Sequence, residues 1–167
     1  MLELKHLSKE AIPAALARVE RYRLLNEPEQ AESICLDVLA TEADNQAALI
    51  ALILSLTDQF DGGTSVRVSE ARELLPRLKS EYDRVYYGGI ICERRARSLL
   101  LQGGLGVGFI AYQWFREAMT WYEKAETLRA SGNDDALLRW NTCARFLNRH
   151  PHLAPPPEEK AEPAFLE

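Results

Sequence analysis

The sequence lacks nearly all signs of β-structure. Only the segment 2–4 alternates between apolar and charged residues, and it is too short to build a sheet. Apolar residues instead recur three and four positions apart along most of the 167 residues. The sequence therefore predicts an all-α protein, and its length indicates a single domain.

Cysteine and histidine are scarce. Cys35, Cys92 and Cys143 are odd in number, lie far apart and form no C-x-x-C pair. This pattern argues against a disulfide framework and fits a reducing compartment. No basic region followed by an apolar stretch opens the chain, so we expect a cytoplasmic protein.

No constellation of side chains demands a reaction. The three histidines have no spaced Cys, Asp or Glu companions that would complete a metal site or a catalytic triad. We therefore expect no catalytic residues, no metal and no cofactor, and we do not expect an enzyme.

Positive charge and long apolar runs are also missing. The formal net charge is -5, which disfavours nucleic acids and anionic membrane surfaces as partners. The longest apolar run covers 47–54, far short of the roughly 20 residues that span a bilayer. The remaining class is a soluble helical protein whose partner is another protein.

Caps and turns divide the first half of the chain into four helices. The first is expected over 13–25, and Asn26 is expected to cap a second with an apolar stripe over 31–39. Asp44 is expected to cap a third, apolar nearly all round, that runs to about residue 60. The fourth is expected to be kinked by Pro76, and the residues on its apolar face are Val68, Ala71, Leu75, Leu78 and Tyr82.

Three further helices are expected in the second half. The fifth runs over 83–101, and the glycine-rich stretch 103–108 then breaks the chain. The sixth has its stripe over 111–128. Asn133 or Asp134 caps the seventh, which ends at 150–151. We accordingly expect an N-terminal extension at 1–10, a helical domain at 11–150 and a flexible, proline-rich acidic tail at 151–167.

Three of these helices share one pattern, in which a small alanine is followed by a bulkier residue four positions on, an apolar residue seven on and a turn twelve on. The three sets are Ala31, Cys35, Val38 and Ala43; Ala71, Leu75, Leu78 and Asp83; and Ala118, Tyr122, Ala125 and Ala130. The pattern resembles the second helix of the tetratricopeptide repeat, in which the alanine lets two helices approach closely. The resemblance covers about 12–149.

The resemblance implies a short array of about three antiparallel helix pairs, closed by a C-terminal capping helix. The three alanines are 40 and 47 residues apart, against ~34 in the family, so the repeats are degenerate. The extra residues fall after Phe60 and after Leu101. Val19 and Ile53 stand where the first two units of the family carry a glycine.

Arrays of this family usually bind an extended peptide in a concave groove lined by the first helix of each unit. Carried over by position, the expected groove residues are Leu16, Glu20, Ile50, Leu54, Ile90, Arg94, Arg97, Leu138, Thr142 and Arg145. Such a groove is apolar at one end and basic at the other. It favours a ligand with apolar anchors and carboxylates.

The alternative is that Ile50 and Leu54 belong to the core, and that the charged cluster at 93–97 is a solvated helix face. The tail ends in the sequence Ala-Phe-Leu-Glu at 164–167, an apolar anchor beside a carboxylate. A further hypothesis is therefore that the tail inserts into the groove, in the same or a neighbouring molecule.

The sequence thus predicts a protein-interaction scaffold or adaptor that binds a peptide or helix of unknown identity. One alternative is a homo-oligomeric structural protein. Another is a binder of a small anionic ligand, or an enzyme, that uses the glycine-rich stretch 103–108 together with Arg94, Arg95 and Arg97.

Overall fold

The computed structural model describes residues 2–62 and 65–155. Over this part of the chain it contains seven α-helices and no strand, which confirms the all-α prediction. The helices are α1 (Ile12–Leu24), α2 (Pro28–Thr41), α3 (Gln46–Thr57), α4 (Ser65–Leu74), α5 (Glu81–Gln102), α6 (Val107–Leu128) and α7 (Asp135–Arg149). Short 3-10 turns lie at Lys9–Ala11, Phe60–Gly62, Leu75–Arg77 and Pro151–Leu153.

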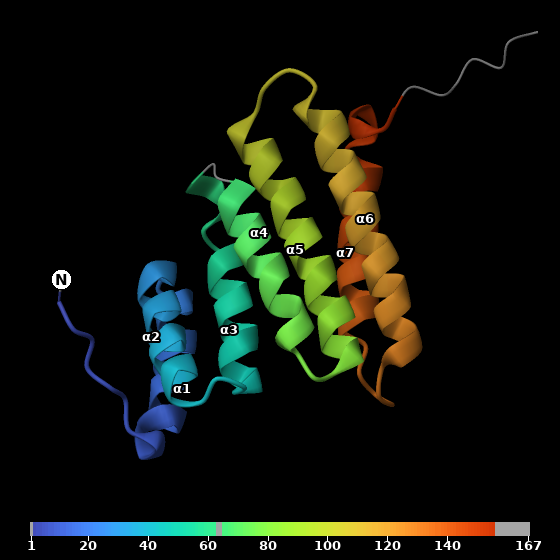
Figure 1. Cartoon of the computed structure of the whole chain (residues 1–167). Helices are drawn as coiled ribbons and strands as arrows, with labels where there is room; N and C mark the ends of the chain where they lie inside the picture. Colours follow the sequence, from blue (N-terminus) through green and yellow to red (C-terminus); the bar gives the residue numbers. More distant parts are fainter. Residues whose placement is uncertain (1, 63–64, 156–167) are drawn as a thin grey trace, which may run out of the picture.

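The helices form a row in chain order. Each of α1, α2, α3, α4, α5 and α6 packs against its successor, and α1 and α2 lie at the opposite end of the row from α6 and α7 (Figure 1). In addition α1 contacts α3, and α3 contacts α5. Contacts between alternate helices arise on the inner side of a curved row. Helices α1, α3 and α5 therefore form the inner layer, and α7 joins it through the ion pair of Arg139 with Glu93 of α5.

Helix α3 explains why its sequence is apolar on nearly every side. It contacts α1, α2, α4 and α5, and Leu49, Leu52, Ile53 and Leu56 are buried among them. A helix with neighbours on most of its sides exposes only a narrow face, so it needs few charged residues.

The alanines of the repeated pattern all lie at tight contacts. Ala31, Ala71 and Ala118 are completely buried in α2, α4 and α6. A larger side chain at any of them would push neighbouring helices apart. The three positions are thus equivalent in burial as well as in sequence.

Two glycines bring α5 and α6 together. A Cβ placed on Gly89 would lie 2.5 Å from the ring of Tyr122, and one on Gly88 would lie 3.1 Å from the ring of Trp121. The aromatic rings therefore occupy the space that side chains on α5 would need. This packing makes α5 and α6 the most closely packed pair of helices in the row.

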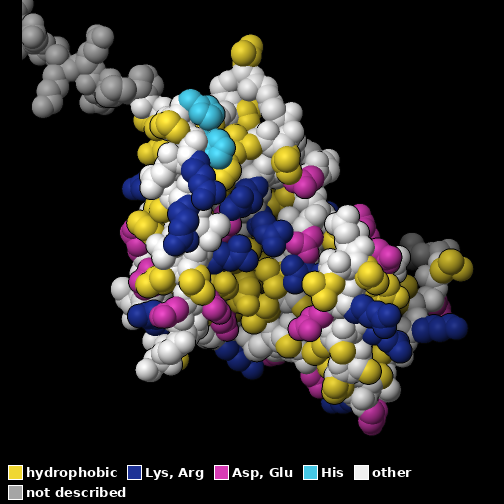
Figure 2. Space-filling model, turned by 180° about the vertical axis from the view of Figure 1, so that it is seen from behind, with side chains coloured by type: hydrophobic (Ala, Val, Ile, Leu, Met, Phe, Trp, Pro, Cys, Tyr) yellow, Lys and Arg dark blue, Asp and Glu magenta, His cyan; other side chains and the backbone are white. Residues whose placement is uncertain are grey.

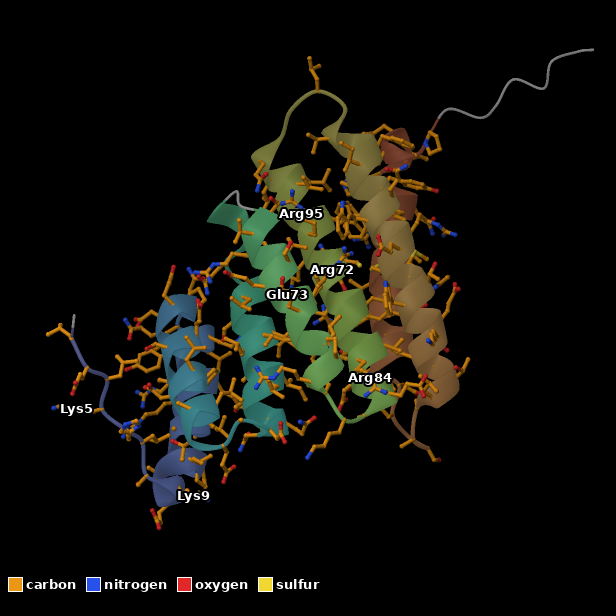
Figure 3. The ribbon with its side chains drawn as sticks, viewed as in Figure 1. Lys5, Lys9, Arg72, Glu73, Arg84 and Arg95 are labelled. Carbon is orange, nitrogen blue, oxygen red and sulfur yellow. The ribbon has the colours of Figure 1, made fainter. Side chains whose placement is uncertain are left out.

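Proline shapes the α4–α5 connection differently from the prediction. Pro76 does not kink a long helix, because α4 ends at Leu74 and a 3-10 turn follows. The proline ring prevents the α-helical hydrogen bond, and the chain then becomes extended at Leu78. Arg84 fixes the turn by donating to the carbonyl oxygens of Leu78 and Lys79 (Figure 3).

Two predicted caps are also wrong. Asn26 does not cap α2, because its backbone is left-handed with φ 60°, and it terminates α1 instead. The N-cap of α3 is Asn45 rather than Asp44, since the Asn45 side chain accepts a hydrogen bond from the Ala48 N–H. Short polar residues suit both roles, so the sequence did not distinguish them.

The folded part extends beyond the predicted boundaries. At the start, the Thr41 hydroxyl donates to the carbonyl oxygen of Leu7. At the end, Leu153 is buried against Gly108. The tail predicted to begin at residue 151 is therefore structured at 151–153, and its remainder from 156 lies outside the described residues.

Candidate binding face

The inner layer has a hollow of about 570 Å³ where α1, α3 and α5 meet. Asp58, one residue beyond the end of α3, is one of its lining residues. Its carboxylate accepts hydrogen bonds from Arg23 of α1 at 2.7 Å and from Arg94 of α5 at 3.0 Å. Asp58 thus ties together three helices of the inner layer. The other lining residues are Glu20, Leu24, Asn26 and Asp61.

A buried carboxylate lies deeper, between α5, α6 and α7. Glu93 is 1% exposed and accepts hydrogen bonds from Arg97 at 3.1 Å and from the Tyr122 hydroxyl at 2.8 Å. Arg139 of α7 approaches the same carboxylate at 3.5 Å. Burying a carboxylate is costly unless its oxygens are hydrogen-bonded and its charge is paired. Glu93 meets both conditions.

Burial, and then the charge of Glu93, raise the pKa of the Tyr122 hydroxyl far above its ordinary value. The phenol therefore keeps its proton and remains a donor at any physiological pH. Glu93 in turn fixes the positions of Arg97 and Arg139, whose guanidinium groups are more than a third exposed. The buried carboxylate positions two cations on the inner surface.

A second hollow, of about 270 Å³, lies between α5 and α7. Four of its lining residues follow the i, i+3, i+4, i+7 spacing of one helix face on α7. We call it the α5–α7 hollow, and its lining residues are Arg97, Thr142, Arg145, Phe146, Arg149 and His150. None of them is acidic.

Aromatic rings support this hollow. Arg97 lies over the rings of Phe115 and Phe146, at 5.7 and 5.4 Å. Phe146 stacks on His150 at 4.2 Å, and the Nδ1 atom of His150 lies 2.8 Å from the Phe146 carbonyl oxygen. Because a carbonyl oxygen only accepts, Nδ1 carries the proton of this bond.

Basic side chains gather on the inner layer. Figure 2 shows Lys and Arg side chains clustered beside an apolar floor in the hollowed face of the molecule. We define the basic face as the five arginines that α5 and α7 contribute to the ion pairs and the hollow described above: Arg94, Arg97, Arg139, Arg145 and Arg149. The inner layer also has half-buried apolar residues that pack on the core, among them Leu54 of α3 and Tyr86 of α5. This positive cluster contrasts with the chain's net charge of -5.

The structure brings together part of the predicted groove. Arg97, Thr142 and Arg145 line one hollow, and Glu20 and Arg94 line the other. Leu16, Ile50 and Leu54 are half-buried, and Leu138 is 59% exposed. Ile90 was wrongly assigned to the groove, because it is 2% exposed and belongs to the core of α5 and α6.

Four residues on or beside the face were missed at the sequence level. Two of them, Arg139 and Arg149, belong to the basic face. The other two lie beside it: Asp58 pairs with Arg94, and Phe146 lines the α5–α7 hollow. The spacing of Arg145 and Arg149, one turn apart on one helix face, was the available signal. No sequence signal paired Asp58 with arginines more than thirty residues away in both directions.

The glycine-rich stretch does not converge with the arginines of the anion-binding hypothesis. Gly103, Gly104 and Gly106 have positive φ and form the turn between α5 and α6. Arg94 points to Asp58 on one side of α5, whereas Arg97 points to Glu93 and the hollow beside α7. Neither hollow is lined by a residue of the glycine-rich stretch 103–108, and Arg95 lines neither of them.

The cysteines do not form a nucleophilic site. All three are buried, and burial raises the pKa of the Cys35, Cys92 and Cys143 thiols to about 12. A thiol with such a pKa supplies almost no thiolate at neutral pH. Their surroundings are those of core residues.

The described part of the chain holds no group of three or more His, Cys, Asp or Glu side chains arranged to bind a metal ion. Over the same residues, none of the helices combines the length and apolar character needed to cross a bilayer. No protein-family model, curated protein or solved structure matches the chain. The geometry of the inner layer therefore carries the functional argument.

Proposed function

We propose that the chain is a protein-interaction scaffold of tetratricopeptide-like architecture, and that its inner layer binds an extended acidic peptide with apolar side chains. The architecture is supported by the completely buried alanines of α2, α4 and α6 and by the contacts of α3 with both α1 and α5. The free, buried thiols suit a reducing compartment, and we place the protein in the cytoplasm.

The observation that carries the proposal is the surplus of cations at the α5–α7 end of the inner layer. Only two carboxylates pair with four arginines here. Asp58 forms ion pairs with Arg23 and Arg94, and Glu93 forms ion pairs with Arg97 and Arg139. Arg145 and Arg149 form no ion pair with any described residue. A ligand carrying several carboxylates would balance this surplus.

The face is already organised for binding. Arg97 and Arg139 are held by Glu93, and Arg94 is held by Asp58. Guanidinium groups fixed in place lose little conformational entropy when they bind a carboxylate in a bidentate manner. The half-buried apolar side chains nearby, such as Leu54 and Tyr86, would accept the apolar side chains of the same peptide.

The test is binding of a fluorescent library of twelve-residue peptides, each with glutamates interspersed with leucine and phenylalanine. We expect saturable binding that weakens as salt is raised, because the arginines are partly solvated. The double substitution Arg145→Gln and Arg149→Gln should weaken binding about tenfold or more, since it removes two charge-assisted contacts.

The matched control is Arg18→Gln with Arg116→Gln. Both arginines are exposed, and they lie on α1 and α6 outside the two hollows. The control removes the same charge and should leave affinity within about twofold, because only long-range attraction changes. Equal losses in both double variants would contradict binding at the basic face.

The chain also carries a segment with the chemistry of the proposed ligand. Residues 158–167 contain four glutamates and the sequence Ala-Phe-Leu-Glu. We propose that this segment competes with the partner, at a local concentration of millimolar order. Replacing Glu158, Glu159 and Glu162 with glutamine in the full chain should then tighten binding of the library peptides, and unchanged affinity would refute the competition.

A further inference from the structure

We propose that the α5–α7 hollow binds a phosphate group carried by the partner peptide, on a phosphorylated serine or threonine. This inference rests on the proposed function, because it takes the partner to be a peptide on the inner layer. It goes further by assigning one subsite and its chemical class.

The charge of the hollow supports an anion of more than one charge. Three guanidinium groups, those of Arg97, Arg145 and Arg149, line it together with the imidazole of His150. The carboxylate that pairs with Arg97 is that of Glu93, which is buried and also accepts a hydrogen bond from Tyr122. A single carboxylate in this hollow would balance only one of the two cations, Arg145 and Arg149, that form no ion pair with a described residue. A phosphate monoester carries about −1.5 to −2 at neutral pH and has three acceptor oxygens.

The cations reach the hollow from two helices. Arg145 and Arg149 lie one turn apart on α7, whereas Arg97 comes from α5 and is held by Glu93 and by the Phe146 ring. Donors that arrive from two sides can surround a tetrahedral group. Donors along one helix face contact it from one side only. Arg clusters of this kind are a recurring means of phosphopeptide recognition.

The size of the hollow matches a side-chain group rather than a whole helix. Its volume is about 270 Å³, and the stacked rings of Phe146 and His150 form one of its walls. The Thr142 hydroxyl also lines the hollow and donates its proton to the Leu138 carbonyl oxygen. The larger hollow at α1, α3 and α5 suits a phosphate less well, because its two arginines, Arg23 and Arg94, are already paired with Asp58 and it also contains Glu20 and Asp61.

The test compares three versions of one peptide library on the full-length protein. The central position is fixed as phosphoserine, serine or glutamate, and the flanking positions are degenerate. We expect the phosphoserine library to bind about tenfold more tightly than the serine library, because it adds charge-assisted contacts. The glutamate library should lie between them, and millimolar inorganic phosphate should remove the preference.

Two variants locate the phosphate. Arg145→Gln with Arg149→Gln should abolish the preference for phosphoserine, whereas Arg18→Gln with Arg116→Gln should keep it. Thr142→Glu places a carboxylate in the hollow and should also abolish the preference. Thr142 is exposed, so this variant should retain the helical circular dichroism and the unfolding midpoint of the parent.

The outcomes separate this inference from the proposed function. If phosphoserine and glutamate libraries bind equally, or if the preference survives Arg145→Gln with Arg149→Gln, the phosphate subsite is wrong and the acidic-peptide scaffold stands. If no library binds at all, both proposals are wrong.

Discussion

The hydroxyl of Tyr122 in α6 donates a hydrogen bond of 2.8 Å to the carboxylate of Glu93 in α5, and both side chains are almost completely buried. The same carboxylate holds Arg97 and Arg139 on the inner layer. The core packing of α5 on α6 and the cations of the candidate site are therefore linked through one buried group.

Tyr122→Phe tests this link. The substitution leaves a buried carboxylate short of one donor, so we expect the free energy of unfolding to fall by about 2 kcal/mol. Urea denaturation would measure it. Tyr112→Phe is the control, since Tyr112 is half-buried on the same helix and its hydroxyl makes no hydrogen bond to the described residues. A Tyr122→Phe loss no larger than that of the control would show that the bond contributes nothing.

Gly89→Ala tests the close approach of α5 and α6. The new Cβ would lie 2.5 Å from the Tyr122 ring, which the hydrogen bond to Glu93 holds in place. Overpacking of about 1–3 kcal/mol should outweigh the gain of about 1 kcal/mol in helix propensity. We expect a lower melting temperature, whereas Gly62→Ala, which meets nothing within 4 Å, should lower it less. A stabilised Gly89→Ala variant would mean that the helices can separate without cost.

The buried thiols predict a loss of stability at alkaline pH. Burial raises the pKa of the Cys35, Cys92 and Cys143 thiols from 9.0 to about 12 in the folded chain. Above pH 9 the unfolded chain releases these protons while the folded chain keeps them, so stability falls as pH rises from 9 toward 12. Below pH 9 both states keep the protons and this contribution is constant. Urea midpoints measured from pH 7 to 11 would reveal the decline.

The same burial predicts slow thiol chemistry. At pH 7.5 we expect a disulfide-exchange reagent such as dithionitrobenzoate to modify none of the three cysteines rapidly, and all three after unfolding in urea. Rapid modification of one thiol in the native protein would show that its helix opens locally.

Arg145→Gln with Arg149→Gln should leave folding unchanged. Neither side chain forms an ion pair with a described residue, so the unfolding free energy should stay within about 0.5 kcal/mol of the parent. This expectation makes the double variant a clean test of binding. A large loss of stability would instead give the two arginines a structural role.

Periodicity predicted the helices well, because each buries one apolar stripe. The stripe through Ala118, Tyr122 and Ala125 is completely buried, as its spacing indicated. The ends of helices were harder to place, because Asn26 and Asp44 have the chemistry of a cap but other residues take that role. Pro76 likewise signals a break without saying whether the helix bends or ends.

The candidate site was only partly predictable. Arg97 and Arg145 followed from their positions on the expected inner helices, and they line one hollow. The burial of Glu93 could not be predicted from the sequence, because a glutamate beside three arginines is typical of a solvated helix face. Only the packing of α7 on α6 brings Arg139 to that carboxylate. Ile90 illustrates the opposite error, since a residue on an inner helix can still face the core.

The most direct measurement is a nitrogen-15 NMR titration of the full chain with the tightest-binding acidic peptide from the library. Binding at the basic face predicts saturable shifts of backbone amides in α5 and α7, and of the guanidinium Nε signals of Arg97, Arg145 and Arg149. Shifts confined to the outer helices α2, α4 and α6, or no saturable shift with any library peptide, would contradict the assignment of the inner layer as the binding surface.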